Sequence, residues 1–184
     1  MPIGLLDTAE NKINNMGLFS ILKGDISHFN NNAVPVLNDI FARLSALEES
    51  TEKEILLKMF STAHGGVDIL FHPDKGIIKY KVKSFNKEAF YVIYEMLVLF
   101  LILSLKNVKF EKADNLKDIF IKAVGRTEEC NALWNELESK KDDERIFKPL
   151  YEKISSYSEG LKREDELAFV SAFHDYVQVF LKTI

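Results

Sequence analysis

The chain has 184 residues, of which 47% are hydrophobic and 28% are charged, and its formal net charge at pH 7 is -4. A chain of this size can bury a sizeable core within one domain, and its composition is that of a globular protein. The negative balance disfavours attraction of the whole surface to nucleic acid or to anionic lipid.

The cysteine content and the N-terminus indicate the compartment. The one cysteine, Cys130, cannot form an internal disulfide, so the chain does not require an oxidising compartment. Residues 1–7 lack the positive region and the long apolar region of a secretory signal. We therefore expect a cytoplasmic protein.

Before residue 65, apolar residues recur at helical spacing in three stretches, which are residues 5–16, 37–47 and 55–63. Residues 30–32 are three asparagines and predict a loop, with Pro35 in the first turn of the helix that follows. Gly65 and Gly66 are expected to end the third helix, because glycine disfavours a helix interior.

Residues 67–83 change from a helical period to a period of two. Apolar side chains alternate along residues 67–71 and again along 78–82. Between them, residues 72–76 contain the Pro, Asp and Gly that suit a type I turn. We therefore predict a β-hairpin at about 67–83, packed on the helices because two strands alone are marginally stable.

The most informative segment is residues 87–107. Its seventeen residues from Ala89 to Leu105 carry a single ionisable side chain, Glu95. A membrane-spanning helix needs about 20 predominantly apolar residues, and a central acid costs roughly 2.5–3.5 kcal/mol on insertion scales. Because the run is shorter and lysines lie at both ends, we interpret it as the buried central helix of a bundle and predict no transmembrane segment.

Further amphipathic helices are predicted after this segment, near residues 116–123, 127–137, 146–154 and 164–182. Asn86 suits the N-cap of the central helix, and Gly125 suits the end of the first helix after it. The last helix carries two apolar stripes and is expected to be packed on two sides. The stripes are Leu167, Val170, Val177, Leu181 and Phe169, Phe173, Tyr176, Phe180.

These patterns predict a mainly α protein at the margin of α+β. We expect residues 1–184 to form a single helical domain, which is a multi-helix bundle around the buried central helix at about 87–107. The β-hairpin at about 67–83 is inserted into it.

Glu95 and His174 are the candidate ligand-binding residues. Burial in an apolar helix would raise the pKa of the Glu95 carboxyl, as in a general acid or a ligand anchor. The alternative is a structural partner, such as a lysine or a tyrosine hydroxyl. His174 lies on an apolar stripe, where a hydrogen-bonded core histidine is the commoner state. If the two residues met, they could form a metal or proton-transfer site.

Five lysines on or beside the predicted hairpin form the candidate partner-binding surface, and they are Lys75, Lys79, Lys81, Lys83 and Lys87. Three of them alternate along one strand, so they would share a face that could bind an acidic partner. The alternative is a solvated face that discourages edge-to-edge aggregation. Since no arginine and no outward aromatic joins them, we predict no nucleic-acid partner.

No nucleotide-binding glycine loop, nucleophile elbow or paired metal-ligand motif is present, so we predict no catalytic residues, no metal and no cofactor. The leading hypothesis is a non-enzymatic, soluble regulatory or protein-protein interaction module with a protein partner, or a homodimer through the C-terminal helix. The rival hypothesis is a helical protein that binds a ligand or a metal ion, either as a simple binder or as an enzyme. In this hypothesis Glu95 and His174 line an internal pocket. In a third hypothesis, the protein binds a membrane surface through the apolar segment from Gly17 to Gly24.

Overall fold

The computed structural model describes residues 7–72, 74–140, 147–158 and 160–183, with side chains described from residue 26 onward. These residues form seven α-helices and one 3-10 helix. They are α1 (Asp7–Ser45), α2 (Thr51–Phe71), η1 (Lys79–Ser84), α3 (Lys87–Asn107), α4 (Ala113–Val124), α5 (Thr127–Glu138), α6 (Lys148–Tyr157) and α7 (Arg163–Leu181). The mainly α class is confirmed.

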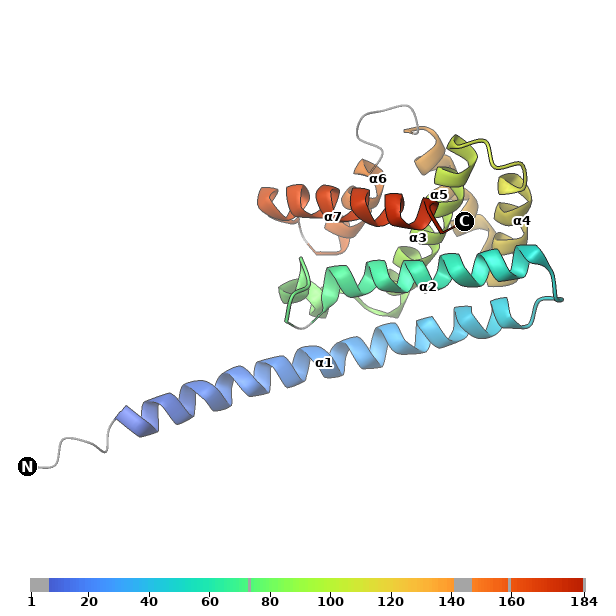
Figure 1. The fold of residues 1–184 in the computed structure, drawn as a ribbon. Helices are drawn as coiled ribbons and strands as arrows, with labels where there is room; N and C mark the ends of the chain where they lie inside the picture. Colours follow the sequence, from blue (N-terminus) through green and yellow to red (C-terminus); the bar gives the residue numbers. More distant parts are fainter. Residues whose placement is uncertain (1–6, 73, 141–146, 159, 184) are drawn as a thin grey trace, which may run out of the picture.

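The helices are arranged around α3. Helix α2 runs antiparallel to α1 and lies between α1 and α7, while α4 and α5 gather at the end of the bundle where α1 ends (Figure 1). The N-terminal part of α1 reaches beyond the other helices (Figure 1). Helix α3 contacts all six of the other α-helices, so it occupies the centre of the fold.

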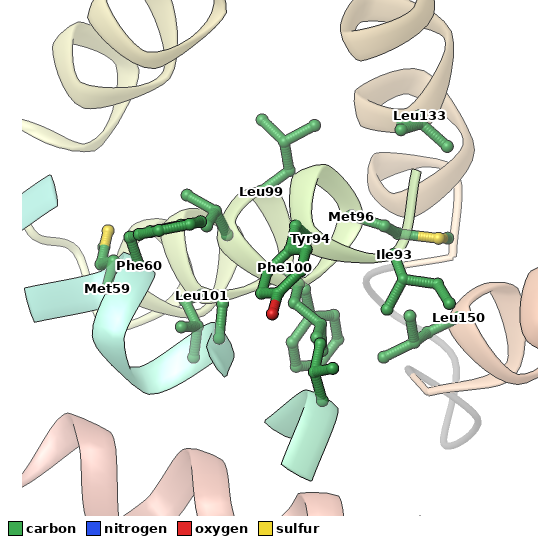
Figure 2. Packing of buried hydrophobic residues seen from close by; sticks show 14 of the residues in the cluster. Met59, Phe60, Ile93, Tyr94, Met96, Leu99, Phe100, Leu101, Leu133 and Leu150 are labelled. Carbon is green, nitrogen blue, oxygen red and sulfur yellow. The ribbon is translucent and has the colours of Figure 1, made fainter. Parts of the chain in front are cut away.

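The side chains of α3 are covered by the protein's own helices. Every residue from Val98 to Leu103 is at most 2% exposed. Figure 2 shows side chains from α2, α5 and α6, among them Phe60, Leu133 and Leu150, around those of α3. Of the described helices, α3 alone is long and apolar enough to cross a membrane, yet 89% of its most apolar window is buried in the bundle. The predicted burial of the central helix is confirmed.

The β-hairpin predicted at about 67–83 is wrong, because the described part of this region contains no strand. Helix α2 continues through Gly65 and Gly66 and ends at Phe71. Val67 and Leu70 are fully buried and extend the inner stripe of α2 at helical spacing. A run that alternates over only five residues also fits this helical spacing, so the short pattern did not distinguish the two structures.

Gly66 is buried within α2 and does not end the helix. A Cβ atom at this position would lie 3.4 Å from the side chains of Leu97 on α3 and Phe173 on α7. The Gly66 amide donates a hydrogen bond of 3.1 Å to the hydroxyl of Tyr176. The Cβ distances would be ordinary van der Waals distances, so close packing does not require glycine here; the helix continues because Val67 and Leu70 beyond it are buried.

The second predicted strand is a turn followed by η1. The amides of Ile77 and Ile78 donate to the carbonyls of Ile69 and Leu70 at 3.0 and 2.9 Å, which satisfies carbonyls at the end of α2. A Cβ at Gly76 would lie 2.5 Å from the backbone nitrogen of His72, so this tight return of the chain requires glycine.

The predicted loop at residues 30–32 is also wrong, because α1 is continuous through the three asparagines and through Pro35. The inner stripe of α1 follows helical spacing across this region and consists of Ala33, Val36, Ile40 and Leu44. Burial of that stripe outweighs the poor helix propensity of Asn and Pro. The predicted stripe at residues 5–16 and the segment from Gly17 to Gly24 lie outside the residues whose side chains are described.

Two predicted helix ends are confirmed. The Asn86 side chain accepts a hydrogen bond of 2.9 Å from the Ala89 amide and caps α3. Gly125 adopts a left-handed conformation, with φ of 73°, directly after α4. The chain therefore turns sharply between α4 and α5, and this turn positions the candidate site.

Candidate functional site

Glu95 lies on α3 and is fully buried. Arg126, at the N-cap of α5, places its Nε atom 2.6 Å from Oε1 of Glu95. The same guanidinium contacts both carboxylate oxygens of Glu88, which precedes Glu95 by two helical turns and shares its face of α3. Arg126 therefore connects the start of α5 to two carboxylates of α3.

The cluster extends through an aromatic ring to α1. The guanidinium of Arg126 lies 5.1 Å from the ring centroid of Tyr91, within the range of a cation–π contact. The Tyr91 hydroxyl donates to Asp39 at 2.8 Å, and Asp39 also accepts from Arg43 at 2.9 Å. Arg43 donates a second bond, of 2.9 Å, to the Val124 carbonyl at the end of α4. Four helices thus meet in one polar network.

The contact between Glu95 and Arg126 is short but poorly aligned. Neither carboxylate oxygen of Glu95 nor the Nε of Arg126 has a hydrogen-bond partner of acceptable geometry among the described residues. An ion pair at 2.6 Å thus supplies attraction without the hydrogen bonds that a buried carboxylate normally receives. Glu95 is the most strongly desolvated acid of the network.

Burial raises the pKa of Glu95 from its ordinary 4.5 to about 7, against the opposing effect of Arg126. Burial alone would lower the pKa of Arg126, but the Glu88 and Glu95 carboxylates hold it above its usual range. The guanidinium therefore stays charged. Because its pKa is near neutrality, the Glu95 carboxyl can gain or lose a proton near pH 7, and proton exchange is the chemistry that this site supports.

Cys130 borders the site on α5 and is fully buried. Burial, together with the nearby Glu95 carboxyl, raises the pKa of the Cys130 thiol to about 12. The reactive form of cysteine is the thiolate, so this thiol is inert while α5 is in place.

His174 is not where the sequence pattern predicts it. Its side chain is 61% exposed on the outer face of α7, and its Nδ1 lies 3.5 Å from Asp175. The prediction of a core histidine is therefore wrong. The structure does not bring His174 to Glu95, because one side chain faces solvent and the other is enclosed by the bundle.

The three lysines predicted to alternate along one strand, Lys79, Lys81 and Lys83, do not share a strand face, because the strand is replaced by η1. Lys79 donates to the Asp74 carbonyl, and Lys81 donates to the Ser158 carbonyl at 2.9 Å. Lys75, Lys83 and Lys87 are exposed. At least two of the five side chains thus stabilise the protein's own fold.

The sequence predicts Glu95 but misses Arg126. An arginine is the preferred partner for a buried carboxylate, and the chain has only four arginines. The small number of arginines limits the candidate partners of Glu95. Arg126 is 31 residues away in the sequence, however, and no local pattern links two residues at that separation. No sequence pattern indicates that Tyr91 contacts Arg126 or that Asp39 accepts a hydrogen bond from Tyr91.

Within the described residues, no group of three or more His, Cys, Asp or Glu side chains is arranged to hold a metal ion. Comparisons of the chain with protein-family models, with curated proteins and with solved structures find no match.

Proposed function

We propose that the protein is a non-enzymatic interaction module that pairs with a second copy of itself through the outer face of α7. One observation carries the proposal. The two apolar stripes of α7 have different environments, and the N-terminal half of one of them is left uncovered, with Leu167 and Val170 68% and 41% exposed.

The aromatic stripe of α7 is buried in the protein's own core. Phe169, Phe173 and Phe180 are each at most 2% exposed, and Tyr176 packs over Gly65 and Gly66 of α2.

The second stripe is covered only at its C-terminal end, where Val177 is 7% exposed and Leu181 packs against the core. The expectation that α7 is packed on two sides is therefore wrong for its N-terminal half, where Leu167 and Val170 are left to a partner.

The spacing of this second stripe suits a helical partner. Leu167 and Val170 are three residues apart, so they share one face of α7, at the spacing of neighbouring contact positions where two helices pack side by side. A second copy offers the same stripe, and a two-fold pairing is the commonest symmetry of soluble oligomers. The uncovered part of the stripe is short, so we expect a weak dimer that depends on concentration.

The alternatives have less support. Lys79 and Lys81 are engaged by backbone carbonyls, which weakens the lysine surface as a partner site. A ligand pocket shared by Glu95 and His174 is disfavoured by the exposure of His174.

Sedimentation of the purified protein over a concentration series tests the proposal. We expect a monomer–dimer equilibrium in the wild type. Replacing both Leu167 and Val170 by glutamate should raise the dimer Kd at least about tenfold, which corresponds to roughly 1.4 kcal/mol or more, because it places charges in the contact.

The matched control is Val108→Glu, which changes another exposed apolar residue, 59% exposed, away from α7. This variant should dimerise like the wild type. A wild-type protein that stays monomeric up to its solubility limit, or a dimer unaffected by the α7 substitutions, would contradict the proposal.

A further inference from the structure

The first turns of α7 contact η1 through side chains. They carry Leu167, which together with Val170 forms the pairing face of α7. We propose that Tyr80 of η1 is a positioning residue for this face, because its hydroxyl holds the start of α7 in the orientation that pairing requires. The proposal rests on the proposed function, since it assigns Tyr80 a role in the pairing of α7.

The start of α7 buries little of its own surface. Between residues 163 and 168 only Asp165 is buried, and it is 8% exposed. The nearest apolar anchors are Leu161, which is partly buried before the helix begins, and Phe169, which is 1% exposed. Helix ends with few buried contacts open locally at a lower free energy than the whole protein. The position of Leu167 therefore depends on the contacts of Asp165.

Asp165 receives two hydrogen bonds on one carboxylate oxygen. The Tyr80 hydroxyl donates to Oδ2 of Asp165, and the backbone amide of Lys162 donates to the same oxygen at 3.1 Å. The second of these bonds closes the N-terminal turn of α7. The Lys162 ammonium also lies 5.3 Å from the ring centroid of Tyr80, within the range of a cation–π contact. Tyr80 thus contacts both residues that define the start of the helix.

Tyr80 belongs to a segment that the core holds in place. Its neighbours Ile78 and Val82 are 1% and 3% exposed, and the Ile78 amide donates to the end of α2 at 2.9 Å. Lys81, next to Tyr80, donates to the carbonyl of Ser158 directly after α6. Side chains of η1 therefore contact the chain on both sides of the connection between α6 and α7. Because η1 is anchored, the bond from Tyr80 fixes the start of α7 relative to the core.

Loss of this bond has an expected size. A hydrogen bond to a carboxylate is stronger than one between neutral groups, so its removal should make local opening of the first turns on the order of tenfold more frequent. Both copies must present an ordered face, so the apparent dimer Kd rises with the inverse square of the ordered fraction. Halving that fraction in each copy raises the Kd about fourfold.

The variant Tyr80→Phe tests the proposal, because it keeps the ring and removes only the hydroxyl. Two quantities are measured on the full chain. One is hydrogen exchange of the amides of residues 166–168 at a concentration where the wild type is monomeric, and the other is the dimer Kd from sedimentation. We expect the exchange to become on the order of tenfold faster and the Kd to rise at least about threefold.

The matched control is Tyr151→Phe. Tyr151 also packs on α7, with its ring centroid 5.9 Å from that of Phe169, and its substitution leaves the bond between Tyr80 and Asp165 in place. The control should therefore keep the wild-type exchange and the wild-type Kd.

Two substitutions of Asp165 test the same bond from its other end. Asp165→Ala should raise the Kd at least as much as Tyr80→Phe does, since it removes the acceptor. Asp165→Asn keeps an acceptor oxygen, so its Kd should fall between those of the wild type and Asp165→Ala. A purely structural role for the bond would lower the free energy of unfolding but leave the Kd between folded copies unchanged.

The outcomes separate this inference from the proposed function. A wild type that stays monomeric would overturn the pairing of α7 and with it the role of Tyr80. A wild type that dimerises with the same Kd as Tyr80→Phe, or equal exchange of residues 166–168 in the two proteins, would overturn the role of Tyr80 alone.

Discussion

Replacing Phe100 by alanine is expected to lower the free energy of unfolding by about 3–5 kcal/mol. Phe100 lies in the middle of α3, is 2% exposed, and its ring centroid is 5.1 Å from that of Phe147. Truncation removes buried apolar area and leaves a cavity that the surrounding helices can fill only in part. Urea titration monitored by circular dichroism measures the loss.

The matched control for this prediction is Phe41→Ala, because Phe41 is 54% exposed on α1. Its expected effect on the free energy of unfolding is within about 0.5 kcal/mol, since a solvent-exposed ring gains little on folding. Equal losses for Phe100→Ala and Phe41→Ala would mean that α3 is not the centre of the core.

Replacing Arg126 by methionine is expected to lower the free energy of unfolding by about 3 kcal/mol at pH 8. The substitution removes the cation beside Glu95, the two contacts with Glu88 and the cation–π contact with Tyr91. An ionised Glu95 would then be buried without a positive partner.

The loss should be smaller at pH 5. Without the guanidinium the pKa of Glu95 rises further above its ordinary value, so below neutral pH the carboxyl is protonated and needs no counter-charge. Stability of the variant relative to wild type therefore falls as the pH rises. Urea titrations at both pH values measure this difference.

The control for this second prediction is Lys58→Met, which changes an exposed cation of α2 that belongs neither to the Glu95 network nor to the exposed face of α7. We expect its effect to stay within about 0.5 kcal/mol at either pH. A loss for Arg126→Met that is the same at pH 5 and pH 8 would show that Glu95 does not change its charge in this range.

The sequence predicts well those features that a single segment determines. The central helix follows from its apolar run, and its start follows from the capping amide of Asn86, since neither depends on distant residues. The predicted hairpin is wrong because the choice between helix and strand depended on tertiary contacts. The burial of Val67 and Leu70 and the hydrogen bond from the Gly66 amide to the Tyr176 hydroxyl favour a continued helix, and no local pattern contains these contacts.

The candidate site shows the same division. Glu95 is conspicuous as the one ionisable residue of an apolar helix, but its partner Arg126 is brought to it by the turn at Gly125. His174 lies on one of two apolar stripes of α7, and the sequence does not say which stripe faces inward. The aromatic stripe buries more apolar area per residue, so it packs into the core, and the opposite face with His174 is left in solvent.

The central claim is that α3 is enclosed by the other helices of the same chain, and hydrogen exchange of its backbone amides tests this most directly. In detergent-free solution we expect residues 92–103 to be among the slowest to exchange, with an opening free energy equal to that of global unfolding. Fast exchange of this segment in a monodisperse sample, or a protein that stays in solution only with detergent or lipid, would contradict the account.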